Sequence, residues 1–150
     1  MGRMYAIVTG ATNVGSGSAV DLLEISAAAA KPVYIHSVVV STGDADEELV
    51  QMSVMRATGA GTGGSSATAR ALDPGDAAAS FTATMNRGTL ASGASEVHAE
   101  RVNVRSRGDI RPTAMEVVGI AGGGIGTIRV GPTASATIQM FCTAYVEEVG

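Results

Sequence analysis

The residues of this sequence best suited to chemistry are four arginines between positions 101 and 111. They are Arg101, Arg105, Arg107 and Arg111, with Asp109 among them. Side chains alternate between the two faces of a strand, so Arg101 and Arg105 share a face if this segment is extended. Guanidinium groups bind carboxylates through paired hydrogen bonds. We therefore expect the four arginines to contact acidic side chains of a partner protein; a solvated sheet face is the alternative.

A run of acidic residues lies earlier in the chain. It contains Asp44, Asp46, Glu47 and Glu48. Clustered carboxylate oxygens are ligands that Ca²⁺ accepts, but a solvated turn between two strands accounts for the same residues. The sequence does not decide whether this run binds a cation, and we assign no metal site to it.

The enzyme motifs in this sequence are incomplete. His98-Ala99-Glu100 has the spacing of the first half of the zinc-deaminase motif, whose second half needs two cysteines. The chain has a single cysteine, Cys142, which is expected to be buried as a small apolar residue. No Gly-x-Ser-x-Gly motif is present to hold a nucleophilic serine between a strand and a helix. We therefore expect a protein that is not an enzyme.

Two glycine-rich segments resemble nucleotide-binding turns. Residues 7–17 are similar to the opening of an NAD(P)-binding short-chain dehydrogenase, but one residue too many separates Gly10 from Gly15. Residues 59–64 match Gly-x-Gly-x-x-Gly, yet no strand-helix-strand unit encloses them. We expect residues 58–66 to form a flexible surface loop, and neither segment predicts a bound cofactor.

The segments that must position these side chains alternate apolar and polar residues with period two. Short turns separate these segments from one another. This pattern is typical of an all-β fold. The strands expected are 4–9, 19–26, 33–41, 47–57, 80–86, 95–105, 115–120, 125–130 and 135–147. A set of about eight to ten strands suits a jelly-roll-like β-sandwich. We expect one domain over residues 1–150.

The segment 33–41 predicts a strong strand, because it is rich in β-branched residues. Strict alternation puts Val33, Ile35 and Val39 on one face. The other face then holds Tyr34, His36, Val38 and Val40. Both faces are largely apolar, which favours a central strand or an outer face covered by a neighbour. We expect segment 33–41 to pair as a hairpin with segment 47–57.

Two breaks and one long strand complete the pattern. A sharp reversal is expected at Leu72-Asp73-Pro74-Gly75-Asp76, because proline fixes its own φ and glycine accepts a positive φ. The alanines at 27–30 are expected to form a loop, since Pro32 would end a helix there. One continuous apolar face is expected on segment 135–147, made of Ile138, Met140, Cys142, Ala144 and Val146.

The composition of the chain argues against some classes of partner and favours another. A net charge of −4 argues against a nucleic-acid-binding protein, because neutralisation of phosphates drives such binding. No run approaches the roughly 18 apolar residues of a membrane span, and the start of the chain has no apolar signal segment. Aromatic residues make up only 3% of the chain, so the core must consist of smaller apolar side chains, which bury less area per residue. We therefore expect self-association, as a trimer in preference to a dimer.

The chain resembles a group of small proteins encoded near the head genes of tailed bacteriophages. The residues that carry the resemblance are an opening MYAIVT, the segment DLLEISA, the glycine-rich loop, ARALDPGDAAA at 69–79, HAE at 98–100 and the ending YVEEVG. The resemblance implies a capsid decoration or cement protein of β-sandwich type. Such a protein would bind the major capsid protein on the outside of the virion, after assembly in the host cytoplasm, and stabilise the shell.

Other functions stay open on the sequence. A head-fibre or tail protein of a phage would share the all-β pattern. A jelly-roll carbohydrate-binding module would also share it, although such modules use aromatic platforms and the chain has no tryptophan. A short-chain dehydrogenase is the remotest alternative because of its glycine spacing.

Overall fold

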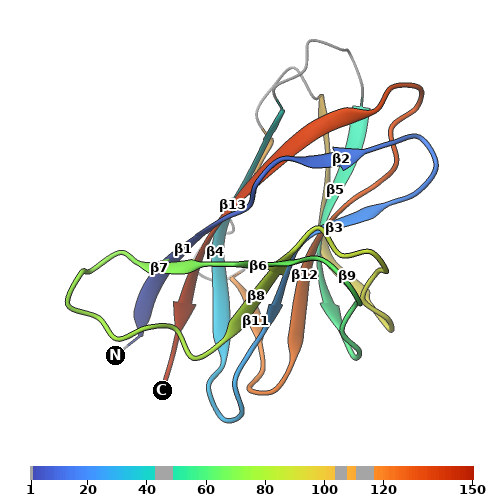
Figure 1. Cartoon of the computed structure of the whole chain (residues 1–150). Coiled ribbons are helices and arrows are strands. Elements are labelled where there is room, and N and C mark those ends of the chain that lie inside the picture. The colour runs from blue at the N-terminus through green and yellow to red at the C-terminus, as the bar shows by residue number, and fades with distance from the viewer. Residues whose placement is uncertain (1, 43–48, 104–107, 111–116) are drawn as a thin grey trace.

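The computed structural model describes residues 2–42, 49–103, 108–110 and 117–150, with residues 108–110 described by their backbone only. All regular structure in these residues is β-strand, arranged as two antiparallel sheets that pack face to face (Figure 1). The expected all-β sandwich is confirmed. The strands outnumber the eight to ten expected, because several are pieces of three residues.

Sheet A contains seven strands in the order β10-β4-β13-β1-β7, with β11 also on β4 and β2 also on β13. Its strands are β1 (Arg3–Val8), β2 (Thr12–Val14), β4 (Val33–Thr42), β7 (Ala69–Ala71), β10 (Gly108–Ile110), β11 (Val118–Ile120) and β13 (Ile138–Glu148). Sheet B contains six strands in the order β6-β8-β3-β12-β5-β9. Its strands are β3 (Val20–Ser26), β5 (Leu49–Ala57), β6 (Ser65–Ala67), β8 (Thr82–Met85), β9 (Ser95–Asn103) and β12 (Ile125–Val130).

The last strand of the chain forms the middle of sheet A. β13 pairs with β1 from Arg3 opposite Glu148 to Val8 opposite Thr143, so the two ends of the chain lie side by side (Figure 1). The predicted apolar face of β13 is confirmed. Its side chains are all buried in the core: Ile138, Met140, Cys142, Ala144 and Val146.

The predicted hairpin between segments 33–41 and 47–57 is wrong. β4 lies in sheet A, where β13 occupies one of its edges and β10 and β11 occupy the other. β5 lies in sheet B between β12 and β9. The chain therefore crosses from one sheet to the other after β4. The apolar faces of two strands are buried equally well when the strands pair side by side in one sheet and when they face each other from the two sheets of a sandwich. The apolar pattern therefore could not distinguish these two arrangements.

A β-bulge in β4 also corrects the predicted faces of this strand. Tyr145 lies opposite Ser37 while Val146 lies opposite Ile35, so His36 is an extra residue. An extra residue reverses the alternation beyond it. Val38 and Val40 consequently join the core, and Val39 turns outward. The expectation that β4 is a central strand is confirmed.

The reversal at residues 72–76 is confirmed, but Gly75 does not adopt the positive φ that was expected to favour it. The Asp76 N–H donates to the Asp73 carbonyl at 3.0 Å, and the Gly75 N–H donates to the Asp73 carboxylate at 2.9 Å. The chain then crosses from β7 in sheet A to β8 in sheet B. The Tyr5 hydroxyl donates a hydrogen bond to the Ala77 carbonyl at 2.9 Å. The Tyr5 ring packs edge to face against the Phe81 ring, with the two ring centroids 5.5 Å apart.

Candidate binding cleft on the outer face of sheet B

Two acidic residues of β3 lie on the outer face of sheet B and are nevertheless fully buried. Arg129 lies opposite Asp21, but Ile128 lies opposite Leu23, so Leu22 is an extra residue in β3. This bulge lets Leu22 and Leu23 both enter the core. It also puts Asp21 on the same outer face as Glu24.

Each buried carboxylate is paired with an arginine. Arg129 donates through Nε and Nη2 to the two oxygens of Asp21, at 2.6 and 3.1 Å. Arg87 donates through Nη2 to Glu24. Asp21 and Glu24 are no more than 1% exposed. Buried charges are tolerated when they are paired and hydrogen-bonded in this way.

The same carboxylates hold two loops against sheet B. The Ala91 N–H donates to Asp21 at 2.7 Å, and the Gly61 N–H donates to Glu24 at 2.8 Å. The two loops are further joined by bridges between Gly59 and Ser92 and between Thr62 and Thr89. The glycine-rich segment 59–64 is therefore a loop, and the anion that its backbone binds is a carboxylate of the same chain. The expectation of a flexible loop over residues 58–66 is corrected in two ways: Ser65 and Ser66 belong to β6, and hydrogen bonds tie the loop to Glu24 and to segment 89–92.

Close approach explains why glycines occupy this loop. A Cβ at position 61 would come within 2.3 Å of the Thr89 carbonyl oxygen. Gly63 and Gly64 adopt φ values of 72° and 86°, which other residues rarely accept. Arg87 completes the attachment by donating to the Gly63 carbonyl at 2.9 Å.

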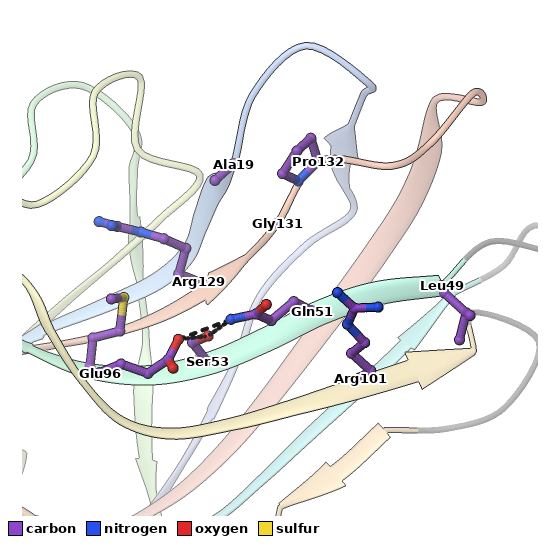
Figure 2. Close-up of a pocket in the computed structure, with 10 residues that line it drawn as sticks. Ala19, Leu49, Gln51, Ser53, Glu96, Arg101, Arg129, Gly131 and Pro132 are labelled. Carbon is purple, nitrogen blue, oxygen red and sulfur yellow. Dashed lines mark hydrogen bonds between the residues drawn. The ribbon is translucent and has the colours of Figure 1, made fainter.

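Beside these loops, the outer face of sheet B carries an open cleft of about 410 Å³ (Figure 2). One wall is formed by β5 and β9. The opposite wall is formed by the residues that precede β3 and follow β12. The lining residues are Ala19, Leu49, Gln51, Ser53, Met55, Glu96, Arg101, Arg129, Gly131 and Pro132.

A hydrogen-bonded trio forms the floor of the cleft. The Ser53 hydroxyl donates to Glu96 Oε2 at 2.6 Å, and Gln51 Nε2 donates to the same oxygen at 3.0 Å (Figure 2). These residues approach one another because β5 and β9 are paired, with a bulge at Val97 that keeps Glu96 on the outer face. Arg129 lies at the same end of the cleft and is already bound to Asp21.

The other end of the cleft carries an exposed charge next to an exposed apolar side chain. Arg101 lies opposite Gln51 on β9 and is drawn beside Leu49 at this end (Figure 2). Leu49 is 63% exposed. Within the described ranges, no hydrogen bond or ion pair engages the Arg101 guanidinium. This end of the cleft therefore offers an arginine fork and an apolar surface to a partner.

The structure does not describe most of the other site residues named from the sequence. Arg105, Arg107 and Arg111 lie outside the described residues, as do the acidic residues Asp44, Asp46, Glu47 and Glu48. His98 and Glu100 are exposed on β9. Among the residues that the structure describes, no group of three His, Cys, Asp or Glu side chains is placed to hold a metal ion.

Sequence reasoning missed most of the residues that build this face. Asp21 and Glu24 stand in the otherwise apolar segment VDLLEIS, and Arg129 is the single charge in IGTIRV. Charges inside apolar strands are a usable signal, because such residues are buried only when paired. Gln51, Ser53 and Glu96 gave no such signal, since only strand pairing brings them together.

No protein-family model matches the chain, and a search of curated proteins finds no match either. In the part of the chain that the structure describes, there is no helix long and apolar enough to span a membrane.

Proposed function

We propose that the chain is a non-enzymatic structural protein of a phage virion that binds the outer surface of an icosahedral capsid and stabilises the shell. The resemblance of residues 69–79 and the flanking segments to phage decoration proteins motivates the proposal. The sandwich fold is compatible with it. The partner is the major capsid protein, and the protein would lie on the exterior of the virion.

The cleft of sheet B is the observation that carries a docking role. Arg101 is the one predicted contact arginine whose side chain the structure describes, and it borders a concave surface on a two-sheet scaffold. Among the lining side chains, Ser53 is bound to Glu96 and Arg129 is bound to Asp21, so this part of the surface is held in place before a partner arrives. A carboxylate on the shell would pair with Arg101, and an apolar side chain would cover Leu49.

Binding energy at this surface stabilises a shell by mass action, because the protein binds the assembled shell in preference to dissociated subunits. An arginine-carboxylate contact that becomes buried on docking contributes about 1.5 to 3 kcal/mol. That amount corresponds to a factor of roughly 10 to 150 in the dissociation constant. An Arg101 contact that stayed exposed would contribute far less.

The test adds the purified chain to empty shells assembled from the capsid protein of the same genome. Occupancy and the temperature of shell disruption are measured for the wild type, Arg101→Ala and Arg101→Lys. We expect Arg101→Ala to bind at least about tenfold more weakly, and Arg101→Lys to recover part of the loss because it keeps the charge without the fork.

Glu100→Ala is the matched control, because Glu100 is the exposed neighbour of Arg101 on β9 and points to the opposite face of the strand. It should leave occupancy unchanged. Equal occupancy by wild type and Arg101→Ala would remove the cleft from the docking surface. Failure of the wild type to bind any shell would remove the decoration function itself.

A further inference from the structure

The outer face of β1 in sheet A is unusually apolar for a sheet surface. The outward side chains of β1 are Met4, Ala6 and Val8, and Val8 is 59% exposed. A solvated face of an antiparallel sheet normally alternates polar residues outward. In β1 both faces are apolar, since Tyr5 and Ile7 on its inner face belong to the core.

The aromatic residues that the core does not use all lie on this face. The chain has three tyrosines and two phenylalanines. Tyr5 and Phe81 are buried in the core. Strand register puts Tyr34, Phe141 and Tyr145 on the outer face of sheet A, and the last two are 37% and 36% exposed. Exposed aromatic residues are enriched at protein interfaces.

Strand pairing arranges these side chains in rows across the sheet. Arg70 of β7, Ala6 of β1 and Tyr145 of β13 form one row. The next row toward the ends of the chain contains Met4 and Glu147. Rows on one face are about 7 Å apart, because every second residue of a strand points to that face.

The charges on the part of this face formed by β7, β1 and β13 balance. Among the outward side chains that the structure describes on these three strands, Arg70 is the exposed cation and Glu147 is the anion, with His36 Nε2 2.9 Å from the Glu147 carboxylate. This part of the face is therefore close to neutral although the whole chain carries −4. Electrostatic repulsion between copies of the chain is therefore weak at this surface.

We propose that two copies of this chain pack together through the outer faces of sheet A, related by a two-fold axis that runs along β1. This axis puts β1 of one copy over β1 of the other, so that Ala6 and Val8 meet their own counterparts. It also puts β7 over β13, so that Arg70 faces the row of Tyr145 and lies one row from Glu147 of the second copy. The same arrangement thus buries the apolar side chains of β1 at the centre of the interface and brings Arg70 close to an aromatic ring and a carboxylate of the second copy.

A pair follows because a single surface that covers itself closes with two copies. The trimer expected from the sequence needs two different complementary surfaces. The strands that overlap around this axis are β7, β1 and β13, about 4.8 Å apart, over about six residues of about 3.4 Å each, a footprint of roughly 15 by 20 Å. Standard interfaces bury about 800 Å² per partner, so this one is small, and we expect dissociation on dilution through the micromolar range. The pairing does not depend on the proposed capsid function.

Sedimentation equilibrium across the micromolar range tests the proposal. The wild type should shift with concentration from 15.0 kDa toward twice that mass. Val8→Asp puts two carboxylates face to face at the axis, and it should stay at 15.0 kDa while its thermal unfolding is unchanged, because Val8 is exposed in the single chain. Leu49→Asp, in the cleft of sheet B, is the control and should associate like the wild type.

A charge exchange tests the register of the pair. Arg70→Glu alone should weaken association at least about fivefold, and the double variant Arg70→Glu with Glu147→Arg should restore it. A wild type of 15.0 kDa at every concentration, or a trimer mass, overturns the proposal. So does normal association of Val8→Asp. A monomer whose Tyr145 and Phe141 resonances shift on addition of a soluble glucan would assign the face to sugar binding instead.

Discussion

The Glu148 side chain binds the end of segment 72–81, in which the chain crosses from sheet A to sheet B. Its side chain is buried at the end of β13 and accepts hydrogen bonds from the Ser80 N–H at 2.8 Å and the Ser80 hydroxyl at 2.7 Å. The Phe81 N–H, at 3.3 Å, and Lys31 Nζ, at 3.7 Å, also lie near it. Burial by itself raises the pKa of Glu148, but the hydrogen bonds from Ser80 and Phe81 and the charge of Lys31 outweigh it, so the pKa is lowered.

A lowered pKa in the folded state makes the stabilisation by Glu148 dependent on pH. The contribution is fully present above the unfolded-state pKa of about 4.3 and is lost as the pH falls through the lower folded-state pKa. We expect Glu148→Gln to lower the free energy of unfolding at pH 7 by more than it does at pH 3. Urea denaturation at both pH values measures the difference.

Glu100→Gln is the comparison for this experiment, because Glu100 is exposed on β9. Its effect on the free energy of unfolding should be small at both pH values. A loss for Glu148→Gln that is the same at pH 3 and pH 7 would show that the Glu148 side chain acts by packing and not by its charge.

At the scale of the element, β3 is the strand that organises sheet B. Its bulge at Leu22 sends two leucines into the core and turns Asp21 outward to Arg129 and the loop at Ala91. Without the extra residue, strict alternation would put Asp21 on the inner face, among the apolar residues of the core. The local irregularity of one strand therefore positions the carboxylate that binds both Arg129 and the loop at Ala91.

We expect Asp21→Ala to lower the free energy of unfolding by about 3 to 5 kcal/mol, because it leaves the charge of the largely buried Arg129 without an anionic partner, and only the Ala91 carbonyl, at 3.1 Å, still accepts a hydrogen bond from it. The double variant Asp21→Ala with Arg129→Leu should recover part of this loss, since no charge is then left unpaired. Urea unfolding at neutral pH measures both variants. An additive effect of the two substitutions would mean that the ion pair contributes no coupling energy.

The sequence predicts which segments are strands more reliably than how these strands pair. The period-two pattern of β13 is strong and local, and its five apolar residues lie where it placed them. The faces of β4 were predicted wrongly from Val38 onward, because a bulge adds one residue without any mark in the sequence. Arg101 was predicted as a contact residue, but its cleft was not, since Gln51 and Pro132 reach it through pairings between distant segments.

At the scale of the whole molecule, Cys142 reports on the integrity of the sandwich. It lies on the inner face of β13, the middle strand of sheet A, and burial raises the pKa of its thiol to about 12. The reactive thiolate is therefore scarce at pH 8, and no reagent reaches it while the sheets stay together. We expect the wild type to react with a maleimide only at the rate of global unfolding.

Leu49→Cys with Cys142→Ala supplies an exposed thiol for comparison and should react at once, because position 49 is open to solvent. The reaction of Cys142 should accelerate with urea in parallel with unfolding followed by circular dichroism. Rapid labelling of Cys142 in the absence of urea would mean that β13 separates from sheet A while the rest of the molecule stays folded.

The positions of β12 and β13 near the middle of their sheets also determine when the two sheets can form as the chain leaves the ribosome. β13 joins β1, β2 and β4, and β12 joins β3 to β5. Both joining strands are translated after the strands that they join, so neither sheet can close before residues 125–148 have left the exit tunnel. Until residues 125–148 have left the exit tunnel, the apolar faces of β1, β3, β4 and β5 have no common partner and remain accessible to chaperones.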